Sequence, residues 1–416
     1  MAGAGERAFC AGGDVTALAQ WNTEGKEGQK RSTDYFGLEY QLDHLIATYP
    51  KPCIAYMDGI TMGGGVGLSV HAPFRIATER TIFAMPETTI GFFPDVGGTF
   101  FLPRLDGYIG KYLALTSARL KGVNVFYSGI ATHYVPSSTL GDLTARLSEL
   151  RFADKFDLAK RNSLVNETIE EFAISIPRDE PPLLRGEFRD AIDRCFVPDT
   201  VEEIIEALQK EAGSGGQFST WAGNTLKTLT ERSPTSLKVT ARQMIAFKET
   251  DIAEVFRREH QLAGKFMAHP DFTEGVTARL VEKRAPKWQP ATLEEISNQD
   301  VNNMFLTATK SLDLLSPEFY TKYPTADSIG LPSEASIANT LRNTDFKSFQ
   351  DVVKFYLEVR RNKPGVKEKV EDSLKRIAGV EKGANGNRVR PLADMAQEEQ
   401  EEKDRASILG QSSDET

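Results

Sequence analysis

Gly59-Ile60-Thr61-Met62-Gly63-Gly64-Gly65-Val66-Gly67 directly follows the apolar run Lys-Pro-Cys-Ile-Ala-Tyr-Met-Asp at residues 51–58. The apolar run predicts a buried strand, and the small residues after it predict a helix that starts at Gly63 and runs to His71. Glycines in series leave backbone N–H groups open to a ligand. At a helix start, free amides and the helix dipole both favour negative charge. We interpret Gly64 as an oxyanion donor; the alternative is a tight strand-to-helix turn with no ligand.

A second glycine segment lies upstream, Phe9-Cys10-Ala11-Gly12-Gly13-Asp14. Its glycines again expose backbone amides, and we expect the N–H of Ala11 to be the partner of the Gly64 N–H. Asp14 fits a helix N-cap better than a catalytic role, because its oxygen can accept a hydrogen bond from a free amide in the first turn.

Two carboxylates follow the glycine segments at short range. They lie in Met85-Pro86-Glu87 and in Phe93-Pro94-Asp95-Val96-Gly97-Gly98-Thr99. Beside an oxyanion site, one acid can attack the acyl carbon or activate water while the other handles the proton. The alternative for Glu87 is a first-turn glutamate that stabilises a helix, and for Asp95 a turn or N-cap residue.

Other glycine-rich motifs do not fit. The dinucleotide pattern G-x-G-x-x-G fails from Gly63, because the sixth residue is Leu68. The P-loop pattern and the serine nucleophile elbow G-x-S-x-G are absent from the sequence. The site therefore indicates acyl or enolate chemistry on a backbone oxyanion hole.

These segments carry a family resemblance. The sequence Cys-Ala-Gly-Gly-Asp at 10–14, the triple glycine, and the run from Met85 to Gly98 resemble the enoyl-CoA hydratase/isomerase (crotonase) superfamily, and within it the 3-hydroxyisobutyryl-CoA hydrolases. The likeness covers residues 8 to about 305. It implies a ββα spiral fold and hydrolysis of the 3-hydroxyisobutyryl-CoA thioester in valine catabolism, in the mitochondrial matrix. It implies no metal or redox cofactor, since coenzyme A is part of the substrate.

The resemblance also assigns roles to residues. Glu87 and Asp95 match the catalytic pair of the hydrolases, and Ala11 and Gly64 match the oxyanion hole. Glu39 matches a third carboxylate that contacts substrate, together with Gly64, Glu87 and Asp95; an ion pair is its alternative role.

One position separates hydrolases from hydratases. Hydratases carry a catalytic Glu three residues after the second glycine of the triple, where this chain has Gly67. Glu87 aligns with the other hydratase Glu, and Asp95 takes a position that hydratases fill with a small residue. The resemblance therefore favours a thioester hydrolase over a water-adding enzyme.

Coenzyme A carries phosphates, so cationic side chains are expected along its path. Arg7, Arg104, Lys111 and Lys121 are candidates, and none is assigned to the site.

Three regions follow from the pattern. We predict an α/β crotonase-like core at 1–150, a helical part of the same domain at 151–305, and an added C-terminal extension at 306–416. Family members carry further strands and a helix before the first glycine segment, whereas only Met1 to Ala8 precede it here. We therefore expect the given sequence to start inside a domain.

Residues 31–49 predict a helix whose apolar stripe holds Tyr35, Leu38, Leu42, Leu45 and Ile46. Glu39 lies within that stripe. A carboxylate on an apolar face is costly without a partner or a function.

The extension has its own charge pattern. Between Lys354 and Arg390 there are eleven Lys and Arg against five Asp and Glu, a net of 11 − 5 = +6. Helices over 346–379, interrupted at Pro364-Gly365, would present this charge to RNA phosphates or to an acidic protein surface; a solvated charged face is the alternative. Fungal members of the resembled family are incorporated in the mitochondrial ribosomal small subunit, which makes ribosomal proteins and rRNA the expected partners. Residues 407–416 predict a disordered tail after the acid-rich 397–404.

Composition sets broad limits. The chain of 416 residues is 40% hydrophobic and 26% charged, with a formal net charge of −9, which disfavours nonspecific nucleic-acid binding by the whole chain. No apolar run approaches the ~20 residues of a membrane span, and no transit peptide is visible. Three scattered cysteines indicate reduced thiols, and the five histidines show no metal-binding spacing.

Overall fold

Short strands alternate between two sheets in the first part of the chain, in a computed structural model that describes residues 1–307, 312–383 and 386–411. The strands are β1 (Ala8–Cys10), β2 (Ile54–Met57), β3 (Ile60–Met62), β4 (Phe74–Ala77), β5 (Ile82–Ala84), β6 (Leu120–Lys121) and β7 (His133–Tyr134). One sheet has the order β1-β3-β5-β6, parallel except for β6. The other has the parallel order β2-β4-β7.

From β1 to β5, consecutive strands of the chain alternate between the two sheets. Each consecutive pair, β2 with β3, β4 with β5, and β6 with β7, places one strand in each sheet. Helical segments separate β3 from β4 and β5 from β6, so the chain repeats strand, strand, helix over these pairs, whereas a short helix (Val123–Tyr127) lies between β6 and β7. Phe74, Ile76 and Phe83 on these strands have no exposed surface, as expected of parallel sheets covered on both faces. The predicted α/β class with a ββα spiral core is confirmed.

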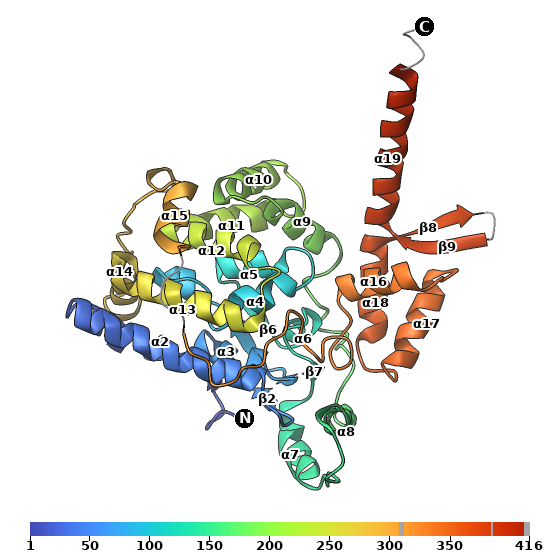
Figure 1. Ribbon diagram of the computed structural model, residues 1–416, viewed down its shortest axis with the longest axis horizontal. Coiled ribbons are helices and arrows are strands. Elements are labelled where there is room, and N and C mark those ends of the chain that lie inside the picture. The colour runs from blue at the N-terminus through green and yellow to red at the C-terminus, as the bar shows by residue number, and fades with distance from the viewer. Residues whose placement is uncertain (308–311, 384–385, 412–416) are drawn as a thin grey trace. The chain divides into compact units, whose positions relative to one another are not determined.

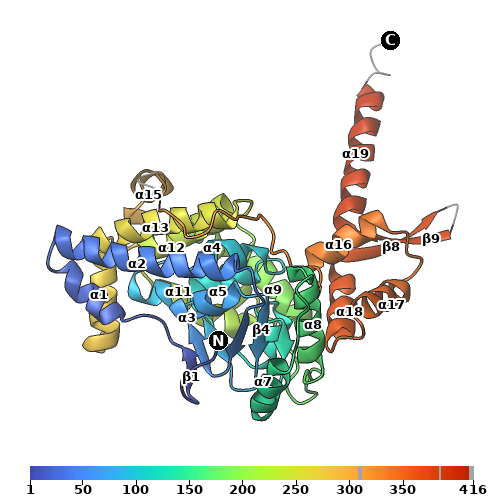
Figure 2. The ribbon, with the colours of Figure 1, turned by 60° about the horizontal axis from the view of Figure 1, so that its bottom comes forward.

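Helices surround the sheets and fill most of the later chain. They are α1 (Val15–Asn22), α2 (Lys26–Ala47), α3 (Gly64–Val70), α4 (Gly98–Phe101), α5 (Ile109–Thr116), α6 (Val123–Tyr127), α7 (Leu140–Ser148), α8 (Leu158–Glu170), α9 (Gly186–Phe196), α10 (Val201–Gly213), α11 (Ser219–Thr230), α12 (Pro234–Ala246), α13 (Ile252–Ala268), α14 (Pro270–Val276) and α15 (Asn298–Phe305). Figure 1 shows α2 and α13 side by side, and Figure 2 shows the same pair from another direction.

Helix α2 buries a different face from the predicted one. Leu38 and Leu42 are 69% and 44% exposed, while Phe36 and Tyr40 are buried. The predicted stripe was wrong at Leu38 and Leu42 and right at Ile46, which is buried. Helix α13 packs on the side of α2 that carries the aromatic rings. Phe256 of α13 lies 6.1 Å from the Tyr40 ring, centroid to centroid.

The segment 312–330 belongs with the first compact unit, which runs from Met1 to Gly330. Ile329 is buried in a core cluster with Phe74 and Ile76. The amide of Ile252 donates to the carbonyl of Tyr320 at 3.0 Å. The compact unit thus continues past the predicted boundary at residue 305.

The second unit starts at Leu331. Its elements are α16 (Glu334–Asn343), α17 (Phe349–Val359), α18 (Val366–Ile377), the antiparallel hairpin β8 (Ala378–Gly383) and β9 (Gly386–Pro391), and α19 (Leu392–Gln411). Two helices separated at Pro364-Gly365 were predicted and are present. Helix α19 runs on from β9 as a long straight helix (Figure 1).

The tail prediction needs correction. Helix α19 continues to Gln411, so residues 407–411 are helical rather than disordered. Glu398 of the acid-rich stretch pairs with Arg390 of β9 at 2.6 Å, and Asp394, earlier on the same helix, pairs with Arg342 of α16 at 2.8 Å. The rest of that prediction, residues 412–416, lies outside the described residues.

Basic side chains of the +6 stretch also find partners within this unit. Arg376 pairs with Glu334 at 3.2 Å, and Arg388 with Asp345 at 3.4 Å. The positive charge of this stretch is therefore partly neutralised locally.

Candidate active site

The strand-to-helix turn at Gly63 places two glycine segments together. Strand β3 ends at Met62, Gly63 adopts φ 52°, and Gly64 is the first residue of α3. A Cβ on Gly64 would lie 3.5 Å from Cα of Gly12, which follows β1. Pairing of β1 with β3 brings this about, because Ala8 and Ile60 are register partners. The predicted helix start is confirmed.

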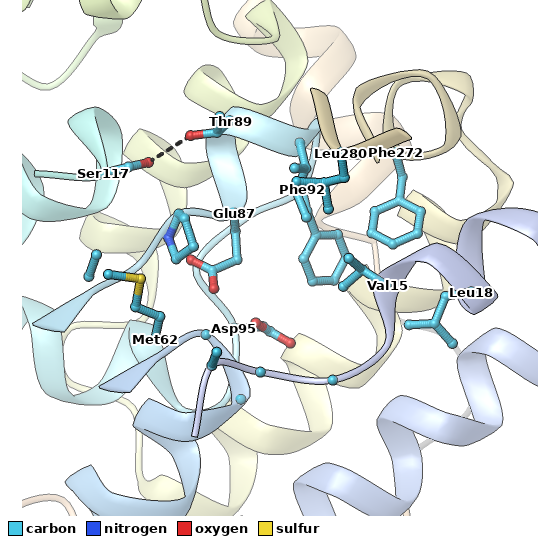
Figure 3. Close-up of a pocket in the computed structure, with 18 of the residues that line it drawn as sticks. Val15, Leu18, Met62, Glu87, Thr89, Phe92, Asp95, Ser117, Phe272 and Leu280 are labelled. Carbon is cyan, nitrogen blue, oxygen red and sulfur yellow. Dashed lines mark hydrogen bonds between the residues drawn. The ribbon is translucent and has the colours of Figure 1, made fainter. Parts of the chain in front are cut away.

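A cavity of about 500 Å³ opens beside this turn. Its lining combines residues of both glycine segments, three acids and a wall of apolar side chains, and Figure 3 shows two of the acids, Glu87 and Asp95. The lining residues used below are Ala11, Gly12, Gly64, Tyr35, Glu39, Glu87, Phe92, Asp95, Arg119, Arg232, Phe272, Arg279 and Leu280. The structure thus brings together every residue that the sequence assigned to the site.

Glu87 and Asp95 reach into this cavity from one connecting segment (Figure 3). Glu87 begins the short 3-10 helix η1 (Glu87–Ile90) after β5, and Asp95 lies in the turn before α4. Glu87 is 5% exposed and Asp95 is 4% exposed. Charge at this depth is costly unless it is compensated, so both acids favour protonation.

The two acids differ in strength. Burial raises the pKa of Asp95 to about 7, and the hydroxyl of Tyr40, which donates to its Oδ2 at 2.6 Å, opposes the rise. Burial and then the Asp95 charge raise the pKa of Glu87 well above its ordinary value. Glu87 Oε2 is buried and has no hydrogen-bond partner in the part of the chain that the structure describes. Asp95 is therefore the readier base or nucleophile and Glu87 the readier proton donor.

Glu39 lies against the oxyanion turn. A Cβ on Gly64 would lie 2.3 Å from its Oε1, so a side chain at Gly64 would displace this carboxyl group. Burial, and next the charge of Asp95, raise the pKa of Glu39 to about 8. No ion pair with Glu39 is present among the described residues. The contact of Glu39 with substrate stays a prediction.

Two buried acids next to the site were missed by the sequence reasoning. Asp43 of α2 has no exposed surface, and neither of its carboxyl oxygens has a hydrogen-bond partner within residues 1–307, 312–383 and 386–411. A Cβ on Gly67 would lie 2.5 Å from Asp43 Oδ2 and 2.7 Å from Cβ of Val96. Asp43 comes four residues after Glu39, so helical spacing was an available signal.

Glu259 of α13 is the second missed acid. Its carboxylate accepts hydrogen bonds from the Gly97 amide at 2.7 Å, the Thr99 amide at 3.0 Å and the Thr99 hydroxyl at 2.5 Å. Burial nevertheless raises the pKa of Glu259 to about 8. Nothing in its local sequence, a charged amphipathic helix, distinguishes Glu259 from a surface residue.

These bonds hold a strained turn. Val96 has φ 53°, a left-handed conformation that is an outlier for a β-branched residue. Such strain persists only where surrounding contacts over-determine it. Here Glu259 fixes the amide of Gly97, and Nε2 of His71 lies 2.8 Å from the carbonyl oxygen of Val96. The turn that carries Asp95 is thus clamped on both sides.

The cations along the cavity differ from the sequence candidates. Arg104 donates to backbone carbonyls of Phe100, Thr250 and Thr321, and Lys111 to that of Pro198. These two are structural. The cavity is lined instead by the arginines Arg119, Arg232 and Arg279.

Asp14 caps α1, accepting from the Ala17 amide at 3.1 Å, as predicted. Among the described residues, no group of three or more His, Cys, Asp or Glu is arranged to hold a metal ion.

The family profile described as enoyl-CoA hydratase/isomerase matches residues 1–305. The chain belongs to the enoyl-CoA hydratase/isomerase family. Its solved members include a carnitinyl-CoA dehydratase from Mycobacterium thermoresistibile, with a TM-score of 0.62 and 34% identity, covering 75% of this chain and 84% of that chain. An enoyl-CoA hydratase from Rhodobacter sphaeroides has a TM-score of 0.59 and 32% identity, covering 76% and 84%.

Relatives of this enoyl-CoA hydratase/isomerase family member fall into two groups. The mitochondrial 3-hydroxyisobutyryl-CoA hydrolase of Homo sapiens is 46% identical over 73% of this chain and 75% of its own length. That of Gallus gallus gives the same identity and coverage. The small ribosomal subunit protein mS47 of Neurospora crassa is 53% identical over 92% of this chain and 76% of its own length.

Proposed function

We propose that this protein hydrolyses the thioester of 3-hydroxyisobutyryl-CoA to 3-hydroxyisobutyrate and coenzyme A, in the mitochondrion. One observation carries the proposal: Glu87 and Asp95 share a cavity with Gly64, in a chain 46% identical to hydrolases of that name. The hydrolases of Gallus gallus and Homo sapiens are mitochondrial proteins.

The proposed reaction depends on the difference in pKa between Asp95 and Glu87. The thioester oxygen would accept hydrogen bonds from the N–H groups of Ala11 and Gly64 as negative charge develops on it. Asp95 would take a proton from the attacking water, or attack the acyl carbon itself to form an anhydride that water then opens. Glu87 would protonate the departing sulfur, giving coenzyme A and the free acid.

Gly67 supports hydrolysis over hydration. The resemblance places the second catalytic glutamate of hydratases at this position, and there is no room for it here. A methyl group alone would come within 2.7 Å of Val96 Cβ. Asp95 instead supplies the second acid.

The arginines support an acyl-CoA ligand. Arg232 donates to the carbonyl of Thr116 at 3.1 Å and Arg279 pairs with Glu231 at 3.7 Å, each through Nη2, and each guanidinium has further N–H groups. Guanidinium groups with free N–H positions suit phosphate oxygens. Together with Arg119, they would hold the phosphates of the coenzyme.

The direct test is thiol release by the purified full-length protein. We expect release from 3-hydroxyisobutyryl-CoA with kcat in the usual range of about 1–10³ s⁻¹, and no hydration of an enoyl-CoA. Absence of thiol release, or hydration of the enoyl thioester at a comparable rate, would contradict the proposal.

A ribosomal role is the second candidate, because the mS47 relative matches 92% of this chain whereas the hydrolases match 73%. The extra coverage points to the second unit. We propose that this unit contacts ribosomal protein or rRNA of the mitochondrial small subunit, with or without retained activity. Co-sedimentation with small subunits at moderate salt, lost when residues 331–416 are deleted, is expected. Sedimentation of the intact chain only as a free small particle would refute it.

A further inference from the structure

Residues 312–323, which we call the strap, contact helix α2 and end at Tyr323, beside His71 and Phe100 of α4. The strap lies beyond the family match, which ends at residue 305. On α2, Gln41 donates to the carbonyl of Asp313 at 2.8 Å, and Nε2 of His44 lies 3.0 Å from that of Glu318. The strap is therefore fixed by backbone contacts to the helix that also carries Glu39.

Tyr323 at the end of the strap reaches the catalytic turn. Its hydroxyl oxygen lies 2.8 Å from Nδ1 of His71. Its ring packs edge-on against Phe100 of α4, with centroids 5.0 Å apart. His71 in turn contacts the carbonyl of Val96 through Nε2, and a Cβ on Gly97 would lie 2.4 Å from the His71 ring.

The chemistry of the contacts fixes the direction of each bond. Burial lowers the pKa of His71 to about 4, so the ring is neutral near pH 7 and carries one N–H. A carbonyl oxygen only accepts, so Nε2 of His71 must carry the proton and donate to Val96. Nδ1 is then an acceptor, and the Tyr323 hydroxyl must donate to it.

We propose that Tyr323 is a positioning residue for Asp95, holding His71 in the tautomer that donates to the Val96 carbonyl and so clamps the catalytic turn. Without the hydroxyl, the tautomer of His71 protonated at Nε2 loses one of the two hydrogen bonds that favour it. The tautomer protonated at Nδ1 then becomes more populated, and in that form His71 cannot donate to the Val96 carbonyl. The left-handed Val96 then has one clamp, Glu259, instead of two. The kinetic part of this inference rests on the proposed hydrolase function.

The test compares two tyrosines of the strap in the full-length chain. Tyr323→Phe keeps the ring against Phe100 and removes the donor. Tyr320→Phe is the matched control, because its hydroxyl donates to the carbonyl of Ala47 at 3.3 Å and does not reach His71. Circular dichroism establishes that both variants are folded.

Two readouts separate positioning from general packing. For Tyr323→Phe we expect kcat to fall about tenfold with KM within about twofold, as for a group that orients the reacting acid. Nitrogen-15 NMR of the imidazoles is expected to show His71 protonated at Nε2 in the parent and a tautomer mixture in Tyr323→Phe. Tyr320→Phe should match the parent in both. In a His71→Gln background, Tyr323→Phe should cost less than about twofold, because the ring it orients is gone.

Opposite outcomes overturn the inference. An unchanged His71 tautomer in Tyr323→Phe, an equal loss in Tyr320→Phe, or full additivity with His71→Gln would each contradict it. A parent protein without thioesterase activity would refute the proposed function instead, while the NMR comparison still decides whether Tyr323 sets the tautomer.

Discussion

The phenolic oxygen of Tyr40 lies 2.6 Å from Oδ2 of Asp95, at a site where neither residue is open to solvent. This bond favours the ionised carboxylate and opposes the effect of burial on its pKa. The pKa of Asp95 is therefore raised less than that of Glu87. The assignment of base and acid in the proposed mechanism depends on that difference.

Tyr40→Phe should therefore shift the pH profile. In the parent, kcat/KM is expected to rise as Asp95 ionises, with an apparent pKa of about 7, and to fall at higher pH as Glu87 loses its proton. A hydrogen bond to a charged group contributes ~1.5–3 kcal/mol, so its loss should move the acid limb up by about one pH unit. Tyr56→Phe, whose hydroxyl contacts Thr144, is the control. An acid limb that stays in place would contradict the role of Tyr40.

Glu87→Gln and Asp95→Asn should each lower turnover by at least ~10²-fold, since each removes a proton-transfer or nucleophilic group. Stopped-flow or steady-state thiol release measures the loss. Glu171→Gln, on an exposed ion pair with Arg146, is the control and should stay near the parent rate. Losses under about threefold at both acids would refute the assigned roles.

Glu259→Gln tests the clamp on the turn from the α13 side. The amide keeps the shape but places a donor where the carboxylate accepts three hydrogen bonds. We expect a loss of ~1–3 kcal/mol in the free energy of unfolding and about a tenfold fall in kcat. Glu254→Gln on the same helix, in an exposed pair with Arg258, should change neither quantity measurably. Equal behaviour of the two variants in denaturation and kinetics would contradict the clamp.

Glu39→Gln should change how stability depends on pH. The folded-state pKa of Glu39 is about 8 against an ordinary value of 4.5, so the folded chain binds more protons between those values. Its contribution to stability is fully present below pH 4.5 and is lost as pH rises toward 8. The variant should therefore melt higher than the parent at pH 8, by at least ~2 °C, and gain less at pH 5. Parallel Tm curves for the two proteins would show that Glu39 is not a buried acid.

Gly67→Ala should destabilise the fold by at least ~2 kcal/mol, because the added methyl meets Asp43 and the strained Val96. Gly141→Ala in α7 is the control, with open space at its Cβ, and should lie within ~0.5 kcal/mol of the parent. Urea denaturation monitored by circular dichroism compares them. Similar denaturation midpoints for both variants would show that the space beside Gly67 accommodates a methyl group.

The sequence was sufficient for the local parts of the site. The turn at Gly63 follows from an apolar run that ends in small residues. Glu87 and Asp95 come at short range after that turn in the sequence. The buried face of α2 was not predictable in this way, because leucines and aromatic residues both recur at helical spacing. Only packing on α13 decides that Tyr40 is inside and Leu38 outside.

Long-range contacts account for what was missed. Glu259 reaches the catalytic turn across 162 positions of sequence, and Tyr323 reaches His71 across 252. Periodicity describes one helix at a time and carries no information on such pairings. The hairpin β8–β9 was missed because its strands hold Glu, Lys, Asn and Arg, which have weak strand preference.

Gly67 also constrains how this site can change over generations. Asp43 and Val96 occupy the space beside it, so a larger side chain at this position requires both neighbours to move or to become smaller. Val96 belongs to the turn that carries Asp95, so any such replacement would also alter the setting of that acid. A single substitution at Gly67 therefore cannot add a carboxylate without displacing the residues around Asp95.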